Sequence, residues 1–172
     1  MIVTHPFFSS SSTVRYESFP KNVQRWDHIR YLILYKLGGL YVDMDYECME
    51  NITPLLYGVT CGMGLEPFGH NVSKRRPIIV NNTFMASVPN HPFIQELIDT
   101  IFHDNVRDNL GSSLVTDKYK NSYYQNQVTL IPAGLITPLT QNEVIKSIHK
   151  RVNKAIENKV GQAYGIRYFL GS

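Results

Sequence analysis

Cysteine is scarce in this sequence, long apolar runs are absent and the net charge is small. Two cysteines, Cys48 and Cys61, are too few for a zinc centre or a disulfide framework, which favours a reducing compartment. No apolar run is long enough to span a bilayer, and the first residues lack the features of a secretory signal. A formal net charge of +3 gives no reason to expect a nucleic acid partner. We therefore expect a cytoplasmic protein.

What is present has the composition of one folded domain. Apolar residues make up 43% of the chain and charged residues 18%, which suits a single domain of ordinary size. Residues 1–20 hold a run of serines and two prolines without a helical period. We expect them to form an extended N-terminal arm with one short strand near residues 13–16. Residues 21–172 are predicted to form the domain itself.

A helix is predicted over residues 21–37, directly before two glycines. Its apolar residues recur at steps of three and four, the period of a helix with one buried face: Val23, Trp26, Ile29, Ile33, Leu34 and Leu37. Gly38 and Gly39 supply the left-handed residue that commonly ends a helix.

The period changes to two after these glycines, which predicts a strand over residues 40–47. One face would carry apolar residues, and the other would be an acidic outer face with Asp43 and Asp45 on the same side. Carboxylates at this spacing can converge on one Mg²⁺ or Mn²⁺ ion, because such ions prefer oxygen ligands. Taken alone, an Asp-x-Asp pair more often marks a solvated turn at the end of a strand.

Charged residues also interrupt the apolar face of the predicted helix. A helical wheel places Arg30 inside the apolar arc and Asp27 at its edge. Two explanations stay open: an internal salt bridge that orients the helix, or contact of both side chains with a bound sugar and phosphate.

The later segments alternate between strands and helices, which predicts a mixed α/β fold. In chain order we expect a strand over residues 78–84, a helix over 93–102, a strand over 128–131, a helix over 141–158 and a strand over 163–170. Residues 104–126 are polar and tyrosine-rich, which is typical of a long loop with a short helix.

The last of these helices opens with a capping box, in which Thr140 precedes Glu143 by three residues. One of its faces is basic: Lys146, Lys150, Arg151 and Lys154. A solvated surface is the commoner role of such a face, and peripheral contact with anionic lipid at the inner face of the membrane is the alternative.

Several of these residues together resemble the signature of a known family. The string Arg25-x-Asp27-x-x-Arg30-Tyr31-x-x-Leu34-x-x-x-Gly38-Gly39-x-Tyr41-x-Asp43-x-Asp45 is similar to that of glycosyltransferases with a DXD sugar-binding region. This group includes mannosyltransferases, capsular polysaccharide enzymes and, more distantly, clostridial glucosylating toxins. Later matching segments are Asn81 to Ala86, His91-Pro92-Phe93 and Tyr164 to Ser172, so the resemblance covers residues 20–172.

The resemblance implies a GT-A-like fold and a metal-dependent glycosyltransferase. A UDP- or GDP-sugar donor would pass its sugar, with retention of configuration, to a glycan or lipid-linked acceptor in polysaccharide assembly. By position, Asp43 and Asp45 would be the catalytic carboxylates and, with Ser172, the ligands of Mn²⁺ or Mg²⁺. The donor sugar would be bound by Asp27, Arg30, Tyr41 and Asn82.

Three departures from the family pattern bear on activity. The N-terminal strand and helix that form much of the nucleobase pocket have no counterpart in the arm, so we expect that surface to be lacking or supplied by an oligomer or a partner segment. Trp26 stands where the family has a small residue, and Arg167 replaces a histidine able to ligate the metal. Glu66 matches an acidic position near the acceptor, although a loop glutamate is usually solvated. The rival hypotheses are a non-catalytic module that binds nucleotide sugars and a hydrolase of nucleotide sugars.

Overall fold

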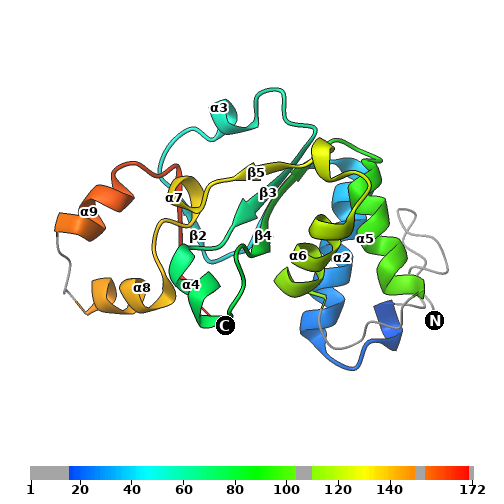
Figure 1. Ribbon diagram of the computed structural model, residues 1–172, viewed down its shortest axis with the longest axis horizontal. Coiled ribbons are helices and arrows are strands. Elements are labelled where there is room, and N and C mark those ends of the chain that lie inside the picture. Colours follow the sequence, from blue (N-terminus) through cyan, green and yellow to red (C-terminus); the bar gives the residue numbers. More distant parts are fainter. Residues whose placement is uncertain (1–15, 104–109, 150–153, 171–172) are drawn as a thin grey trace.

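A mixed four-stranded sheet lies at the centre of the molecule. The computed structural model describes residues 16–103, 110–149 and 154–170 (Figure 1). The strands are β1 (Gly39–Val42), β2 (Tyr46–Cys48), β3 (Cys61–Leu65), β4 (Val80–Ser87), β5 (Thr129–Ile131) and β6 (Gly165–Arg167). The sheet order is β1-β4-β3-β5, with β4 antiparallel to both neighbours and β5 parallel to β3, while β2 and β6 form a separate antiparallel pair.

Helices cover both faces of this sheet, so the predicted α/β class is confirmed. They are α2 (Asn22–Leu37), α3 (Thr53–Leu56), α4 (Phe68–Ser73), α5 (Pro92–His103), α6 (Ser112–Asn121), the short 3-10 helix η1 (Gln125–Gln127), α7 (Ala133–Ile136), α8 (Gln141–Ile148) and α9 (Lys154–Val160). Neighbouring residues of a strand point to opposite faces. Met85 accordingly joins the main core with α2, α5 and α6, whereas Phe84 packs with Ile136 of α7 on the other side.

Gly38 ends α2 as predicted, and the surrounding structure shows why glycine is needed there. Its φ is +66°, and its N–H donates to the carbonyl of Leu34 at 2.8 Å. A Cβ atom at this position would lie 2.7 Å from Cδ of Pro89 and 2.8 Å from the carbonyl oxygen of Ser87. The close approach brings α2 and β1 against the turn between β4 and α5.

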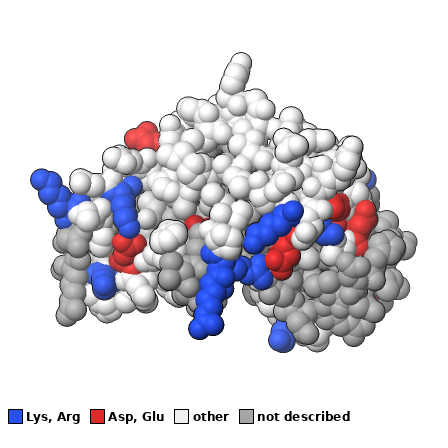
Figure 2. Space-filling model, in the orientation of Figure 1, with Lys and Arg blue, Asp and Glu red and all other residues white. Residues whose placement is uncertain are grey.

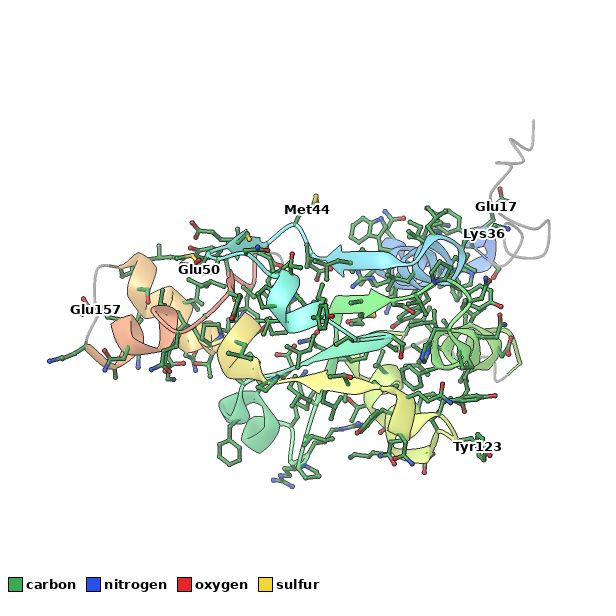
Figure 3. All side chains as sticks on the ribbon, turned by 90° about the horizontal axis from the view of Figure 1, so that it is seen from above. Glu17, Lys36, Met44, Glu50, Tyr123 and Glu157 are labelled. Carbon is green, nitrogen blue, oxygen red and sulfur yellow. The ribbon has the colours of Figure 1, made fainter. Side chains whose placement is uncertain are left out.

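The predicted strand over residues 40–47 is wrong in two respects. It breaks after Val42 into a turn at Asp43–Asp45, and β2 then pairs with a different strand. The apolar face is also the exposed one, since Leu40 is 41% and Met44 104% exposed. Figure 3 shows Met44 pointing away from the body of the molecule. The side chains of Asp43 and Asp45 therefore face inward, the reverse of the predicted orientation, whereas Glu47 is exposed.

The helix predicted over residues 21–37 is confirmed, but its apolar stripe is not all buried. Trp26 and Leu37 are 57% and 60% exposed, while Tyr31 and Leu34 are fully buried. The buried face also carries polar side chains: Gln24, Asp27, His28 and Arg30. A helix that buries charges while it exposes tryptophan is not held by hydrophobic burial alone, so its buried charges need polar partners.

The helix predicted over residues 141–158 is wrong in extent. α8 ends at Ile148 and α9 begins at Lys154, with residues 150–153 outside the described residues. The capping box is confirmed, because the N–H of Glu143 donates to Thr140 Oγ1 at 3.3 Å and the N–H of Thr140 donates to Glu143 Oε2 at 2.8 Å.

The other predicted elements are present as β4, α5, β5 and β6. The ends of β4, α5 and β5 differ from the prediction by one to three residues, whereas β6 spans only three of the eight residues predicted over 163–170. No strand was predicted at β3, because Gly62 and Gly64 are disfavoured in strand interiors and have no side chain to mark a polar face. Residues 104–126 contain α6 and η1, and residues 104–109 lie outside the described residues. Tyr16 to Ser18 are helical rather than extended, and Phe19 is buried in the main core.

On the face drawn in Figure 2, Lys and Arg side chains lie singly or beside carboxylates rather than in one continuous patch. Among the described residues, Lys159 pairs with Glu143 at 2.6 Å. Within the described ranges, no helix has the length and apolar character needed to cross a membrane. Lys150 and Arg151 lie outside those ranges, so contact with lipid stays a prediction.

Candidate functional site

Arg30 is the fixed charge at the centre of the site. Its Nη1 donates to the carbonyl of Asn82 at 2.7 Å and to Asp43 Oδ1 at 3.1 Å, while Nη2 lies 3.3 Å from Asp27 Oδ1. The guanidinium carbon is 4.7 Å from the centre of the Tyr41 ring, and the side chain is 8% exposed. Because guanidinium is a rigid fork of donors, this single side chain ties α2, β1 and β4 together.

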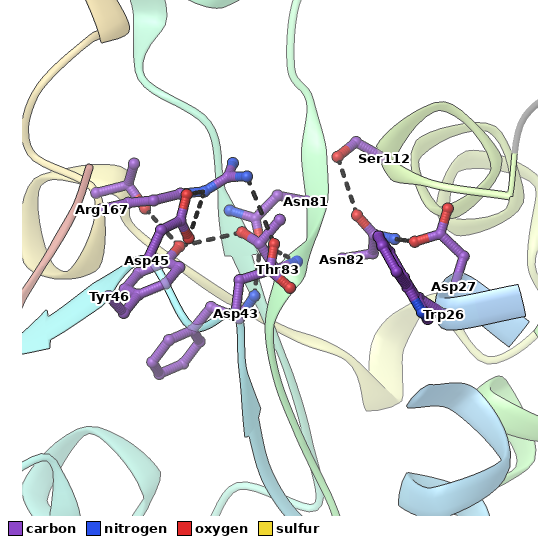
Figure 4. Close-up of polar contacts among 12 residues, drawn as sticks. Trp26, Asp27, Asp43, Asp45, Tyr46, Asn81, Asn82, Thr83, Ser112 and Arg167 are labelled. Atoms are coloured by element: carbon purple, nitrogen blue, oxygen red, sulfur yellow. Dashed lines mark hydrogen bonds and ion pairs between the residues drawn. The ribbon is translucent and has the colours of Figure 1, made fainter. Parts of the chain in front are cut away.

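Asp27 and Asn82 form the part of the site next to α6. Asn82 Nδ2 donates to Asp27 Oδ1 at 2.7 Å, and Ser112 Oγ donates to Asn82 Oδ1 at 3.4 Å (Figure 4). Burial raises the pKa of Asp27, and the nearby Arg30 and the hydrogen bond from Asn82 oppose this rise only in part. A Cβ at Gly111 would lie 3.5 Å from Asp27 Oδ2. The arrangement offers buried oxygen and amide groups in fixed directions, as a sugar with several hydroxyls requires.

Asp43 lies between the two arginines of the site, Arg30 and Arg167. Its Oδ1 accepts from Arg30 and also from the hydroxyl of Tyr41 at 2.9 Å. Burial raises the pKa of Tyr41, which keeps its hydroxyl protonated as a donor. The N–H of Asp43 donates to the carbonyl of Thr83 at 2.9 Å and so holds the turn against β4. The other oxygen, Oδ2, lies 3.5 Å from Nη2 of Arg167.

Arg167 lies among three carboxylates, and each of them meets a different nitrogen. Its Nε is 3.4 Å from both oxygens of Asp45, its Nη1 is 3.5 Å from Glu66 Oε1, and its Nη2 faces Asp43. Glu66 is 6% exposed and its second oxygen lies 2.7 Å from Nδ1 of His70. Asp43 and Asp45 thus converge on one cation, as the sequence predicted, but the cation is the guanidinium of Arg167.

The carboxylates fit a divalent ion in kind and in charge, since Mn²⁺ and Mg²⁺ prefer oxygen ligands. Their present spacing suits a guanidinium, which is much wider than a metal ion. Among the described residues, no three His, Cys, Asp or Glu side chains stand close enough together to hold a metal. Ser172, the third predicted ligand, lies outside the described residues.

The structure brings together all the predicted site residues that it describes: Asp27, Arg30, Tyr41, Asp43, Asp45 and Asn82. Of the two explanations for Asp27 and Arg30, the internal ion pair is present, and contact with a ligand stays a prediction. The sequence assigned no role to Ser112 or Asn81. For Glu66 it left open an acidic position near the acceptor or a solvated loop residue, and the structure shows Glu66 buried. Nothing in the spacing of Glu66 and Arg167, about a hundred residues apart, could have joined them.

Comparison with known proteins supports the predicted family. Residues 1–60 match the family model described as a glycosyltransferase sugar-binding region containing a DXD motif. The matched range holds the α2 charges and the Asp43–Asp45 turn, and it includes residues 1–20, which the predicted resemblance left out. The predicted resemblance to these glycosyltransferases is therefore confirmed, and the family model itself covers residues 1–60.

Three relatives agree with this match. An inositol phosphoceramide mannosyltransferase of Schizosaccharomyces pombe is 36% identical over 86 residues, which cover 50% of this chain and 22% of the relative. A mannosyl phosphorylinositol ceramide synthase of Saccharomyces cerevisiae is 31% identical over 143 residues, which cover 83% of this chain and 31% of the relative. An uncharacterized glycosyltransferase of Acanthamoeba polyphaga mimivirus is 29% identical over 133 residues, which cover 72% of this chain and 50% of the relative.

The chain thus spans from about a fifth to half of the length of these relatives. The solved glycosyltransferase PaToxG superposes with a TM-score of 0.48 and 18% identity, over 87% of this chain and 50% of that one, a likeness too low to bear on function.

Proposed function

We propose that this protein is a glycosyltransferase that moves a sugar from a UDP- or GDP-sugar to a glycan or glycolipid acceptor, with retention of configuration. One observation carries the proposal: the family's DXD carboxylates and the Asp27–Arg30–Asn82 network meet through Asp43 in one site. Arg30 fixes the geometry, because it bonds to both parts at once. Positioning of the donor by such a rigid network lowers the barrier to transfer.

The relatives narrow the choice of substrate. Two of them are named for transfer of mannose to inositol phosphoceramide. We therefore favour a UDP- or GDP-activated mannose as donor and a glycolipid as acceptor over the capsular polysaccharide that the sequence also suggested. An acceptor of this kind would bring the protein to a membrane surface, in keeping with the predicted peripheral location on the cytoplasmic side.

A divalent ion stays part of the proposal. Asp43 and Asp45 would hold Mn²⁺ or Mg²⁺, which would stabilise the negative charge of the departing nucleoside diphosphate. The chain's own groups do the rest. Asp27, Arg30 and Asn82 would bind and orient the transferred sugar, and the Tyr41 hydroxyl holds Asp43 in place. No side chain is assigned as a nucleophile.

A panel assay tests the proposal. The protein is incubated with UDP- and GDP-sugars, with and without Mn²⁺, and with a glycolipid or a free sugar as acceptor. Donor binding, release of diphosphate and the anomer of the product are then measured. Transfer to the acceptor supports the proposal, binding without turnover supports the non-catalytic module, and turnover without acceptor supports the hydrolase.

Asp45→Ala supplies the matching variant. We expect it to abolish Mn²⁺-dependent donor binding while the fold remains, because its only described side-chain partner is Arg167, at 3.4 Å. Asp117→Ala is the control, since Asp117 is exposed and pairs with Arg76 at 2.7 Å away from the site. If Asp45→Ala binds donor as the native chain does, the assigned role of Asp45 is wrong.

A further inference from the structure

Arg167 occupies the point on which the site's carboxylates converge. Two segments supply the acidic groups: Asp43 and Asp45 come from the turn after β1, and Glu66 follows β3. β6 brings Arg167 to the same place from the far end of the chain. The side chain is 12% exposed, so its charge is largely removed from water. A cation position therefore exists here, and the chain itself fills it.

The guanidinium is held loosely for such a buried ion. Its contacts with the three carboxylates are 3.4–3.5 Å long, whereas charge-assisted N–H···O bonds are usually about 2.7–2.9 Å. All its described polar partners are carboxylates, and it also lies 4.8 Å from the centre of the Phe169 ring. Arg30, by contrast, reaches a backbone carbonyl at 2.7 Å. Carboxylate partners can be taken over by another cation, whereas a backbone carbonyl in a sheet cannot leave its place.

The charge balance favours a stronger cation at this point. Asp43, Asp45 and Glu66 carry three negative charges around a single guanidinium, and Arg30 shares only Asp43 with them. A divalent ion carries twice the charge and binds oxygens at about 2.0–2.2 Å, so it would attract these carboxylates more strongly than guanidinium does.

A second, independent feature indicates that the same place receives a ligand. Asn81 is fully buried, and its Nδ2 has no hydrogen-bond partner among the described residues. Its Oδ1 accepts from the N–H groups of Thr83 and Phe84 at 3.2 and 3.0 Å, which fixes the orientation of the amide. Figure 4 shows Asn81 on the side of β4 that faces Asp45 and Arg167. A buried donor left unpaired costs free energy unless an acceptor satisfies it. The Asn81 N–H group cannot ligate a cation, so it would donate to an oxygen of a ligand that the cation holds, such as a phosphate.

We propose that Arg167 is the resident counter-ion of a cation centre formed by Asp43, Asp45 and Glu66, and that a divalent ion enters only by displacing its guanidinium. Arg167 keeps the carboxylates apart at guanidinium spacing and so competes with the metal. The inference rests on the proposed function for its meaning in sugar transfer, but cation binding can be measured without any sugar donor.

The test compares Mn²⁺ affinity in the native chain, Arg167→Gln, Arg167→Lys and the control Arg76→Gln, by electron paramagnetic resonance of free Mn²⁺. Removal of a positive charge within a few ångströms of the metal should tighten the Kd of Arg167→Gln by at least about tenfold. Arg76 pairs with Asp117 on the surface, so its variant should bind as the native chain does.

Equal Mn²⁺ affinity in the native chain and Arg167→Gln would overturn the proposal, and so would an absence of binding in both. Circular dichroism checks that the variants fold. If Arg167→Gln does not fold, Arg167→Lys is used instead. A lysine ammonium cannot contact three carboxylates at once, so it should compete with the metal less well than the guanidinium does. We expect the Arg167→Lys variant to bind Mn²⁺ at least about threefold more tightly than the native chain does. Tighter Mn²⁺ binding without sugar transfer would contradict the proposed function and leave this inference standing.

Discussion

Arg30 and Arg167 sit in similar surroundings, yet the chain holds them in different ways. Both are nearly buried, both lie over an aromatic ring, and both contact Asp43. Arg30 donates at 2.7 Å to the carbonyl of Asn82 and at 3.1 Å to Asp43. Arg167 comes no closer than 3.4 Å to any of its carboxylates.

The difference follows from the elements that carry the two side chains. Arg30 lies in the middle of a sixteen-residue helix packed on the main core, and its backbone acceptor belongs to the longest strand of the sheet. Arg167 is the last residue of a three-residue strand in the small second sheet. A charged side chain on a rigid helix, bonded to a backbone carbonyl, stabilises the fold. A charged side chain on a short strand, held only by carboxylates, can exchange its partners.

Removal of the Arg30 side chain should produce the largest effect. Arg30→Ala leaves Asp27 without a counter-ion and leaves Asp43 with only the more distant Arg167, which should lower the free energy of unfolding by about 3–5 kcal/mol. Urea denaturation measures the loss. Arg76→Ala is the matched control and should cost no more than about 1 kcal/mol, because its ion pair is exposed. If the two variants lose the same unfolding free energy, Arg30 stabilises the fold no more than a surface charge does.

The sequence predicted that Arg30 belongs to the site, but it did not predict that Arg167 pairs with the site's carboxylates. Local periodicity placed Arg30 in the apolar arc of a helix and Asp43 beside Asp45, and both placements survive in the structure. A strand's period cannot show which face the rest of the chain will cover, and so Leu40 and Met44 proved exposed and the carboxylates faced inward. The partners of Arg167 come from distant segments that only tertiary folding joins.

Arg167→Gln tests how much Arg167 contributes to the stability of the fold. Its contacts are long, and glutamine can still donate to one carboxylate, but Asp45 loses its only described side-chain partner. We therefore expect the free energy of unfolding to fall by about 2–3 kcal/mol, less than in Arg30→Ala. Saturating Mn²⁺ should restore part of this stability, because a ligand that binds only the folded state stabilises it. Thermal unfolding with and without Mn²⁺ provides the measurement, and a loss as large as that of Arg30→Ala would show that Arg167 is a structural brace as well.

Glu143→Gln tests whether a short distance or burial decides how much an ion pair contributes to stability. Lys159 lies 2.6 Å from Glu143, closer than any partner of Arg30, but the lysine side chain is 46% exposed. Solvent screens such a pair, so we expect a loss of about 0.5 kcal/mol. A loss near that of Arg30→Ala would mean that distance alone decides.

The same residue gives a pH test. Partial burial raises the pKa of Glu143, but hydrogen bonds from Lys159 and Thr140 outweigh this and lower it below its usual 4.5. A lowered pKa in the folded state means that the carboxylate stabilises the protein above pH 4.5 and that this contribution is lost as the pH falls through the native pKa. The difference in unfolding free energy between the native chain and Glu143→Gln should therefore shrink on acidification, measured by urea denaturation at pH 7 and pH 3.5.

Asp27→Asn should change the free energy of unfolding least. Whether this free energy rises or falls decides between a binding and a structural role for Asp27. Burial raises the pKa of Asp27, so the fold favours the neutral form, and the native chain loses stability as the pH rises from 3.8 through the native pKa. Asparagine is neutral and still accepts from Asn82, and Arg30 keeps Asp43 as its counter-ion. We therefore expect no loss and a small gain in unfolding free energy at pH 7, which disappears in acid, together with loss of donor binding. Substantial destabilisation with donor binding intact would show that Asp27 serves the fold. A charge that weakens the fold at neutral pH and is needed for the donor belongs to the binding site.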